Sequence, residues 1–281
     1  MKKGNKWLYI PLTLVALLVW WPLWFMLMGA MMSPEELRDC FGPALNSTAG
    51  QAHWSILPTW PTPEPLAELL LDTPEFLTTF WNTCMMVLPQ VLGQFLIATP
   101  AAWAFSRLRF RGRKTLFTLY IVLMLMPFQV MMAPNYLVLD SLGLMDTVWA
   151  VILPGIFSAF PVFIMSKSFD AIPWEIQDAA YLDGANQWQV FWQVGLPLGR
   201  PGIYAALVLT FLESWSAIEQ PMTFLRDEAY WPLSLVIPNV LGADVAYAMG
   251  ASFVALVPAI VIFRFGQKYL ELGIQSSGLV Q

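Results

Sequence analysis

The segment at residues 76–106, FLTTFWNTCMMVLPQVLGQFLIATPAAWAFS, contains no Asp, Glu, Lys or Arg. A helix needs about 20 apolar residues to cross the hydrocarbon core of a bilayer, and this segment is longer than that. The whole chain of 281 residues has a similar character, because 58% of its residues are hydrophobic and only 12% are charged. Soluble domains contain about 25% charged residues. The sequence therefore predicts an integral membrane protein.

Five further stretches are long and apolar enough to span a membrane. Together they give six expected transmembrane helices, at approximately residues 8–32, 79–105, 115–138, 147–167, 202–222 and 245–264. Only the fifth contains acidic residues, Glu213 and Glu219. The other five contain prolines well inside them, which predicts bent helices. The expected fold is all-α, a polytopic membrane protein built as a single transmembrane domain over residues 1–281.

The distribution of cations predicts the orientation, because loops retained in the cytoplasm are enriched in Lys and Arg. With the N-terminus inside, all of the 14 Lys and Arg residues except Arg38 and Arg226 lie on the cytoplasmic side. The basic cluster at residues 107–114 is explained by this anchoring at the lipid surface. We expect a multi-pass protein of the cytoplasmic (plasma) membrane, with both termini in the cytoplasm.

Composition excludes several classes of function. A formal net charge of -5 leaves no basic field for nucleic acid. Cys40 and Cys84 are the only cysteines, too few for a disulfide scaffold, and a single histidine leaves a zinc site without its usual ligands. The phosphate-binding motif G-x-x-x-x-G-K-[ST] does not occur. We therefore expect no ATP site, no metal or other cofactor and no catalytic residue in this chain.

The polar segment at residues 168–200, between the fourth and fifth expected spans, is long enough for two short helices. Pro173 suits the first position of a helix. Gly184 is the residue type favoured just after a helix C-terminus. The sequence between them predicts a first short helix on the cytoplasmic face. Its small residues Ala179 and Ala180, with Ala185 beyond the glycine, are expected to form a surface into which another protein could pack.

A second short helix is expected directly after this turn. Asn186 is a typical N-cap residue. The apolar residues that follow recur at helical spacing and predict one face toward the underside of the membrane domain; they are Trp188, Phe191, Trp192 and Gly195. Pro197 is expected to end this helix.

The run from Asp178 to Ala185, DAAYLDGA, continues through Phe191 to Leu196 and Pro197 with the spacing of a known signature. It resembles the EAA loop of ATP-binding-cassette importer permeases, E-A-A-x-x-D-G-A followed by an aromatic residue and then x-L-P. Asp178 stands where the usual glutamate is found, one methylene shorter. The lead-in around Phe169 and the tail at residues 273–280 resemble the second permease subunit of the carbohydrate branch, which includes maltose-type and glycerol-phosphate-type permeases.

The resemblance covers essentially the whole chain and implies a type I importer permease-like fold. It also implies a second, related permease, two ATP-binding-cassette ATPase subunits that bind ATP and Mg, and an extracytoplasmic solute-binding protein. The solute would be a sugar or related polar compound, moved as ATP-driven closure of the ATPases shifts the loop and switches the helices between inward-open and outward-open states. The residues implied in coupling to the ATPases are Asp178, Ala179, Ala180, Asp183, Gly184, Ala185 and Pro197.

The fifth expected span suggests where a solute could pass. At 1.5 Å per residue, Glu213 would lie just past the middle of the membrane and Glu219 near its outer boundary. In a continuous helix Ser216 and Gln220 would share a face with Glu213, and Trp215 would lie beside Glu219. These side chains could bind the hydroxyl groups of a sugar. Alternatively, Glu213 bonds to the partner permease or to a backbone carbonyl at a kink.

Two other classes of function remain for comparison. An ion- or proton-coupled secondary transporter would explain Glu213 and the bent helices, but it gives the cytoplasmic helices no role. A membrane-embedded enzyme would need a catalytic constellation, which the sequence lacks. Transport that persists without ATP and collapses with the ion gradient would indicate the secondary transporter.

Overall fold

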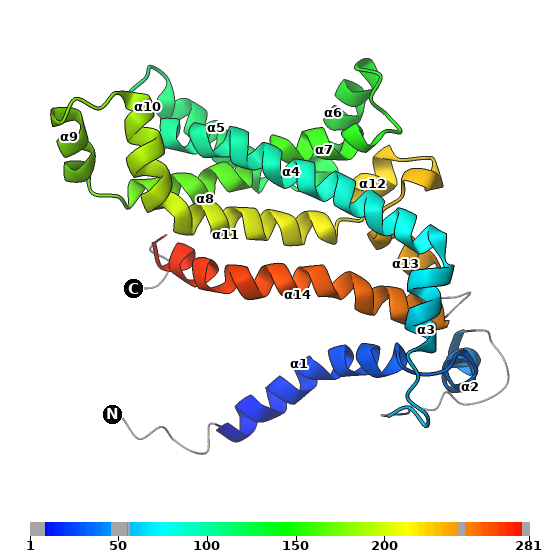
Figure 1. Ribbon diagram of the computed structural model, residues 1–281. Helices are drawn as coiled ribbons and strands as arrows, with labels where there is room; N and C mark the ends of the chain where they lie inside the picture. The colour runs from blue at the N-terminus through cyan, green and yellow to red at the C-terminus, as the bar shows by residue number, and fades with distance from the viewer. Residues whose placement is uncertain (1–8, 46–54, 56, 241–244, 277–281) are drawn as a thin grey trace. The chain divides into compact units, whose positions relative to one another are not determined.

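The structure is a computed structural model that describes residues 9–45, 55, 57–240 and 245–276 (Figure 1). Within these residues the regular structure is entirely helical. Among these residues five helices are long and apolar enough to cross a membrane, and the number is six if the bent pair α5 (Arg113–Leu125) and α6 (Phe128–Ser141) is counted as one span. The expected all-α membrane fold is confirmed. By packing, the chain divides into two compact units.

The first unit contains the described residues up to Phe80, together with 235–240 and 245–257. Its elements are α1 (Tyr9–Gly29), α2 (Pro34–Leu45), α3 (Glu64–Ala67), the π-helical turn η2 (Glu68–Asp72) and parts of α4 (Pro74–Arg107), α13 (Leu233–Val240) and α14 (Val245–Ser276). Met32 and Leu37 form a small core with Val245 and Ala246. The Glu36 carboxylate accepts hydrogen bonds from the N–H and Oγ1 of Thr59, each at 2.8 Å. By contrast, no residue in the apolar window of α1 is buried, as suits a helix that faces lipid or another subunit.

Cys40 on α2 and Cys84 on α4 are both free thiols. Burial raises the pKa of the Cys40 thiol, and the nearby Glu36 carboxylate raises it further. The Cys40 thiol is therefore kept in its protonated, unreactive form at neutral pH.

The second unit contains residues 81–234 and the described residues from Pro258 onward. Besides parts of α4, α13 and α14, its elements are α5, α6, α7 (Val148–Ile156), α8 (Ala159–Asp170), α9 (Trp174–Leu182), α10 (Gln187–Val190), the π-helical turn η3 (Phe191–Gly195), α11 (Leu196–Trp215), α12 (Glu219–Phe224) and the 3-10 turn η4 (Glu228–Tyr230). The second half of α14 packs on α11 through Tyr204 and Tyr269, whose ring centroids lie 4.7 Å apart. Residues 277–280 of the expected C-terminal tail lie outside the described residues.

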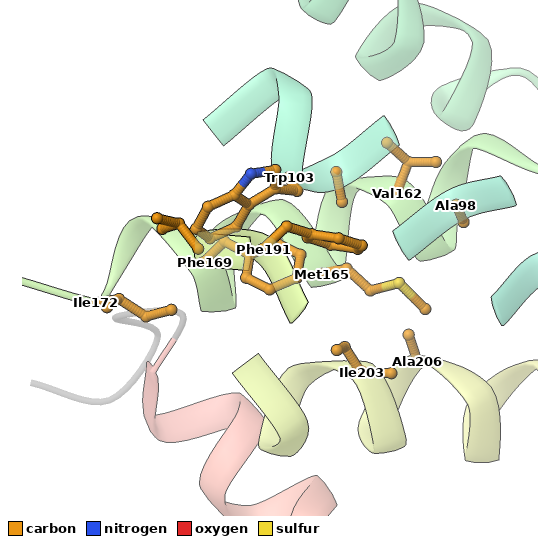
Figure 2. Packing of buried hydrophobic residues seen from close by; sticks show 11 residues of the cluster. Ala98, Trp103, Val162, Met165, Phe169, Ile172, Phe191, Ile203 and Ala206 are labelled. Atoms are coloured by element: carbon orange, nitrogen blue, oxygen red, sulfur yellow. The ribbon is translucent and has the colours of Figure 1, made fainter. Parts of the chain in front are cut away.

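The main core of the second unit lies where α4, α8 and α11 meet the segment that contains α9 and α10. Figure 2 shows its centre, where Trp103 packs edge-on against Phe169 with ring centroids 5.2 Å apart and also contacts Phe191. Gly195 lies so close to this cluster that an added Cβ would come within 2.6 Å of the Trp103 ring. The core therefore joins the membrane helices directly to the base of the segment that contains α9 and α10.

The expected span at residues 115–138 is bent by 107° between α5 and α6. Met126 is extended there, with φ −73° and ψ 127°, because the helical region is disfavoured for a residue that precedes proline. The span at 147–167 similarly divides into α7 and α8 after Ile156. In a continuous helix the ring of Pro161 would clash with the carbonyl of Phe157. The predicted bend is confirmed and sharp in the first of these spans; in the second the helix is interrupted after Ile156, but α7 and α8 still count together as one spanning segment.

The fifth span differs most from expectation. α10, η3 and α11 form one helical span from Gln187 to Trp215, and α12 is a separate element. The helix ends where it does because the ring of Pro221 would clash with the carbonyl of Ala217. The expectation of one helix over residues 202–222 is therefore wrong.

Pro197 does not end a second short helix, contrary to expectation. The chain passes through η3, where the Leu196 N–H bonds to the Phe191 carbonyl, and Pro197 occupies the first turn of α11. A π turn lets the helix continue through the proline because it changes which carbonyls need an N–H partner. α9 is thus the one short helix that stands apart from the membrane spans in the described part of this segment.

Candidate functional site

The first candidate site is the turn that ends α9. The N–H of Gly184 donates to the Tyr181 carbonyl and the N–H of Ala185 to the Ala180 carbonyl, each at 3.0 Å. Gly184 itself has a φ of +87°. These two bonds and the left-handed glycine make a Schellman motif. The expected glycine stop of α9 is confirmed, and it fixes the direction in which the chain leaves the helix.

Asn186 begins α10 two residues after this glycine. Its Oδ1 accepts a hydrogen bond from the Gln189 N–H at 2.9 Å, while the Gln189 Oε1 accepts from the Asn186 N–H at 2.8 Å. This reciprocal pair is a capping box. The expected N-cap is confirmed, so both ends of the short turn are held by backbone hydrogen bonds.

The exposed side of α9 has a different make-up from the one expected. Asp178, Ala179 and Asp183 are exposed, and the Leu182 side chain is 89% exposed. Ala180 and Ala185, by contrast, are partly buried and pack against the core cluster around Trp103. The expectation that all three alanines form one outer surface is therefore wrong. The surface available to a partner is the apolar side chain of Leu182, flanked by the carboxylates of Asp178 and Asp183.

The second candidate site is a polar cluster inside the membrane-spanning part of the second unit. Gln90 Nε2 donates to Ser214 Oγ at 2.8 Å. Gln94 Nε2 donates to the Gly155 carbonyl at 2.7 Å, and Gln94 Oε1 accepts from Thr210 Oγ1 at 2.6 Å. The cluster therefore cross-links α4, α7 and α11 by side-chain hydrogen bonds.

A cavity of about 20 Å³ adjoins this cluster, lined by Thr83, Met86, Val87, Gln90, Val151, Ser214, Ala217, Gln220, Pro221 and Pro232. A space of that size holds about one water molecule. Gln90 and Gln94 were not singled out from the sequence, although two glutamines four residues apart in an uncharged span are a usable signal of one polar helix face. In the described conformation the chain by itself has no room here for a sugar.

The residues expected on one face of the fifth span lie on different elements. Glu213 and Trp215 belong to α11, Ser216 lies in the break, and Glu219 and Gln220 belong to α12. Glu213, Ser216 and Glu219 are exposed, and Trp215 and Gln220 are half-buried. Because the helix stops at Trp215, the expectation of a common helical face is wrong.

The two polar residues of α12 bind different neighbours. Gln220 Nε2 donates to the Val151 carbonyl at 3.1 Å and lines the small cavity. The Glu219 carboxylate accepts two bonds from Gln129 Nε2, at 2.8 and 3.0 Å. α12 is therefore connected to α7 on one side and to α6 on the other.

The profile of one protein family matches residues 94–275, a segment that contains α9, the Gly184 turn and the polar residues around Gln94. This family is described as the binding-protein-dependent transport system inner membrane component. The match covers more than half of the chain. The chain belongs to this family. It is a permease subunit of an ATP-binding-cassette importer and an inner membrane component.

Other permeases are similar to this one over most of its length. GanQ, the galactooligosaccharides transport system permease protein of Bacillus subtilis, is 29% identical over 279 residues, 96% of this chain and 93% of that protein. AraQ, the arabinooligosaccharides transport system permease protein of Halalkalibacterium halodurans, is 28% identical over 205 residues, 72% of this chain and 74% of that protein. The inner membrane ABC transporter permease protein YcjP of Escherichia coli is 26% identical over 280 residues, 96% of this chain and 95% of that protein.

A solved structure shares the fold. It is the crystal structure of a bacterial ABC transporter involved in the import of the acidic polysaccharide alginate, and one of its chains matches this permease with a TM-score of 0.74 at 23% identity. The match covers 93% of this chain and 94% of that chain. The importer permease fold is confirmed.

A clasp joins two loops of the permease outside its spanning helices. Asp146, before α7, has a φ of 61°, and its N–H donates to the Phe224 carbonyl at 3.0 Å. Its Oδ1 accepts bonds from the N–H groups of Arg226 and Asp227, at 2.8 and 2.9 Å. The two N–H bonds, Asp227 first, hold the pKa of the Asp146 carboxyl below its usual value, and the charge of Arg226 acts in the same direction.

The clasp predicts a pH-dependent contribution to the stability of the permease. A lowered pKa in the folded state means that the Asp146 carboxylate stabilises the fold above the usual carboxyl pKa of about 3.9. That contribution is lost as pH falls through the lower pKa of the folded state. We expect Asp146→Asn to lower the unfolding temperature in detergent at pH 7, and the difference from the wild type to shrink progressively below about pH 4. Asp140→Asn, a change at an exposed aspartate on α6, is the control; an equal loss there would contradict the assignment.

Proposed function

We propose that this permease pairs with a second, related permease and two ATP-binding-cassette ATPase subunits, and that it imports a carbohydrate delivered by an extracytoplasmic binding protein. The observation that carries the proposal is α9, a short, exposed helix fixed at its end by the Gly184 turn. Because the sequence contains no phosphate-binding loop, ATP and Mg are bound by the partner ATPases.

The chemistry of α9 supports docking to the ATPase. Burial of an exposed leucine side chain such as Leu182 contributes about 1.5–3 kcal/mol to an interface. Asp178 and Asp183 beside it offer carboxylates to basic or N–H groups of the ATPase. Ala179 allows close approach of the ATPase. Four further residues lie behind this surface and shape the turn and its base, namely Gly184, Ala180, Ala185 and Pro197.

A carbohydrate solute is proposed from the relatives and from the polar groups at the α11–α12 break. GanQ and AraQ are named for galactooligosaccharide and arabinooligosaccharide transport. Polar and aromatic side chains that suit a sugar lie at the break and are the proposed pathway residues, namely Glu213, Trp215, Ser216, Glu219 and Gln220. Since the cavity beside them holds about one water, we propose that the pathway opens only in the complete transporter.

The proposed topology places both termini and α9 in the cytoplasm. The cation distribution of the sequence supports it. α9 is then on the side where ATP is hydrolysed, and the Asp146 clasp is on the side of the binding protein.

Purification and reconstitution test this proposal. We expect an ATPase and a second permease to co-purify with the chain from its native membranes. In liposomes containing this complex, oligosaccharide uptake is expected to require ATP and the binding protein, and to persist when an ionophore dissipates the ion gradient. Uptake that continues without ATP and stops with the ionophore would contradict the proposal. Glu213→Gln serves as a check, because it would remove the coupling group of an ion-driven carrier but leave ATP dependence intact in an importer.

A further inference from the structure

Arg107, the last residue of α4, lies at the junction of three helices. Its side chain is only 3% exposed. The guanidinium Nε donates to the Phe169 carbonyl at 3.0 Å, and Nη2 donates to the carbonyls of Phe169 and Ile172. Carbonyl groups at the C-terminal end of a helix lack intrahelical partners and attract a cation. Arg107 therefore binds α4 to the C-terminal end of α8.

The same guanidinium also reaches α9. It lies over the ring of Trp174, the first residue of α9, with 4.5 Å from Cζ to the ring centroid. Ser106, next to Arg107, donates from Oγ to Asp170 Oδ1 at 2.5 Å and so adds a second bond between α4 and α8. The end of α4, the end of α8 and the start of α9 thus meet at one side chain.

This arrangement has a cost that stability alone does not explain. Arg107 Nη1 is buried without a hydrogen-bond partner among the described residues, and so is Gln177 Oε1 on α9. An unpaired buried polar group destabilises the fold, because it has lost its hydrogen bonds to water. Both residues line an open groove of about 630 Å³ between α9 and the end of α4. A purely structural anchor would be expected to satisfy these groups.

We propose that Arg107 is a positioning residue that makes α9 move as one body with α4 and α8. α9 is joined to α8 by only three residues, Ala171 to Pro173, which by themselves would let the helix swivel. A guanidinium that bonds two carbonyls of the α8 end and stacks on α9 removes that freedom. The inference rests on the proposed docking of α9 to an ATPase. It names Arg107 as the residue through which a movement of α9 reaches the membrane helices.

Substitutions in the reconstituted complex test the role of Arg107. Arg107→Met keeps the length of the side chain but removes every donor, and we expect solute uptake per ATP hydrolysed to fall about tenfold while the ATPase still co-purifies. Arg107→Lys, which keeps the charge but not the planar group, is expected to restore part of the ratio. Trp174→Leu, which removes only the stacking, is expected to give an intermediate loss. Arg111→Met, at an exposed arginine of the neighbouring loop, is the matched control and is expected to change nothing.

A distance measurement separates this role from a loss of stability. Spin labels are placed at Glu175→Cys, an exposed position of α9 outside the surface proposed to meet the ATPase, and at Leu96→Cys on α4, after replacement of Cys40 and Cys84. In the wild-type background we expect the same distance between the labels with and without nucleotide. In Arg107→Met we expect nucleotide to change that distance, because α9 then moves without α4.

The possible failures can be told apart. If the wild-type chain recovers no ATPase, the proposed function itself fails. If the wild type is coupled and Arg107→Met keeps its uptake ratio and its constant distance, the role of Arg107 is refuted. If Arg107→Met does not insert, Arg107→Lys and Trp174→Leu decide, and normal ratios in both would also refute it.

Discussion

Replacing Gly184 with tryptophan is expected to abolish solute-stimulated ATP hydrolysis while the chain still inserts into the membrane. Gly184 has a φ of +87°, and residues with a side chain pay about 1–2 kcal/mol in that conformation. A cost of this size shifts the population of the native turn by about tenfold. The indole would in addition project beside Asp183 and Leu182, on the surface proposed to meet the ATPase. The turn is therefore distorted and obstructed at the same time.

The measurement is ATP hydrolysis by the purified complex, with and without solute-loaded binding protein. Gly112→Trp is the matched control, since Gly112 has a φ of +83° and open space around it but lies in a different loop, between α4 and α5. It carries the same backbone strain without touching α9. Normal stimulation in Gly184→Trp, or an equal loss in Gly112→Trp, would contradict a specific role for the α9 turn.

The second large effect is expected for Gly202→Leu, which should prevent stable folding of the second unit. A Cβ at Gly202 would lie 2.1 Å from the Ser168 Cβ, and one at Gly199 would lie 2.3 Å from the Phe169 ring. α8 and α11 thus approach each other closely along a row of small residues, the usual way in which membrane helices associate. Overpacking costs about 1–3 kcal/mol when neighbours can shift. Since the obstacle here is the Cβ of a buried serine, we expect the upper end of that range or more.

The yield of folded protein in detergent and its unfolding temperature measure this effect. Gly42→Leu is the control, because nothing lies within 4 Å of a Cβ built at Gly42. We expect a clear loss of folded protein for Gly202→Leu and little change for Gly42→Leu. Equal yields and equal unfolding temperatures would mean that the contact between α8 and α11 relaxes freely.

The membrane fold and the α9 turn were predictable from sequence because both depend on local chemistry. Uncharged runs identify the spans, and Gly184 and Asn186 each stabilise a helix end by a bond to a near neighbour. The EAA-like run then identified the family, which the match over residues 94–275 confirms.

The errors came from steric effects of proline and from tertiary packing. Pro221 ends α11 at Trp215, six residues upstream, whereas Pro197 is accommodated by a π turn. The sequence alone does not say whether a proline will end a helix or be accommodated by a π turn, because the packing of neighbouring helices decides between the two outcomes. Ala180 looked like part of an outer surface, yet it packs inward, since helical spacing indicates a face without telling which core it meets.

Arg107 was grouped with the other basic residues of its loop for a related reason. Its neighbours in the sequence are exposed arginines, and positive-inside anchoring explains such a cluster. Only the structure brings the α8 carbonyls and the Trp174 ring, more than 60 residues away, around this one guanidinium.

The unbroken helix from Gln187 to Trp215 has a geometric consequence. Its 29 residues form a stiff rod about 40 Å long, since a helix rises 1.5 Å per residue. One end begins at the Asn186 cap, beside the α9 turn, and the other stops next to the Gln90 and Ser214 pair. A tilt of about 10° about the Gln187 end would displace Trp215 by about 7 Å, enough to pull that pair apart. A small rotation at one end of the rod would thereby break hydrogen bonds at the other.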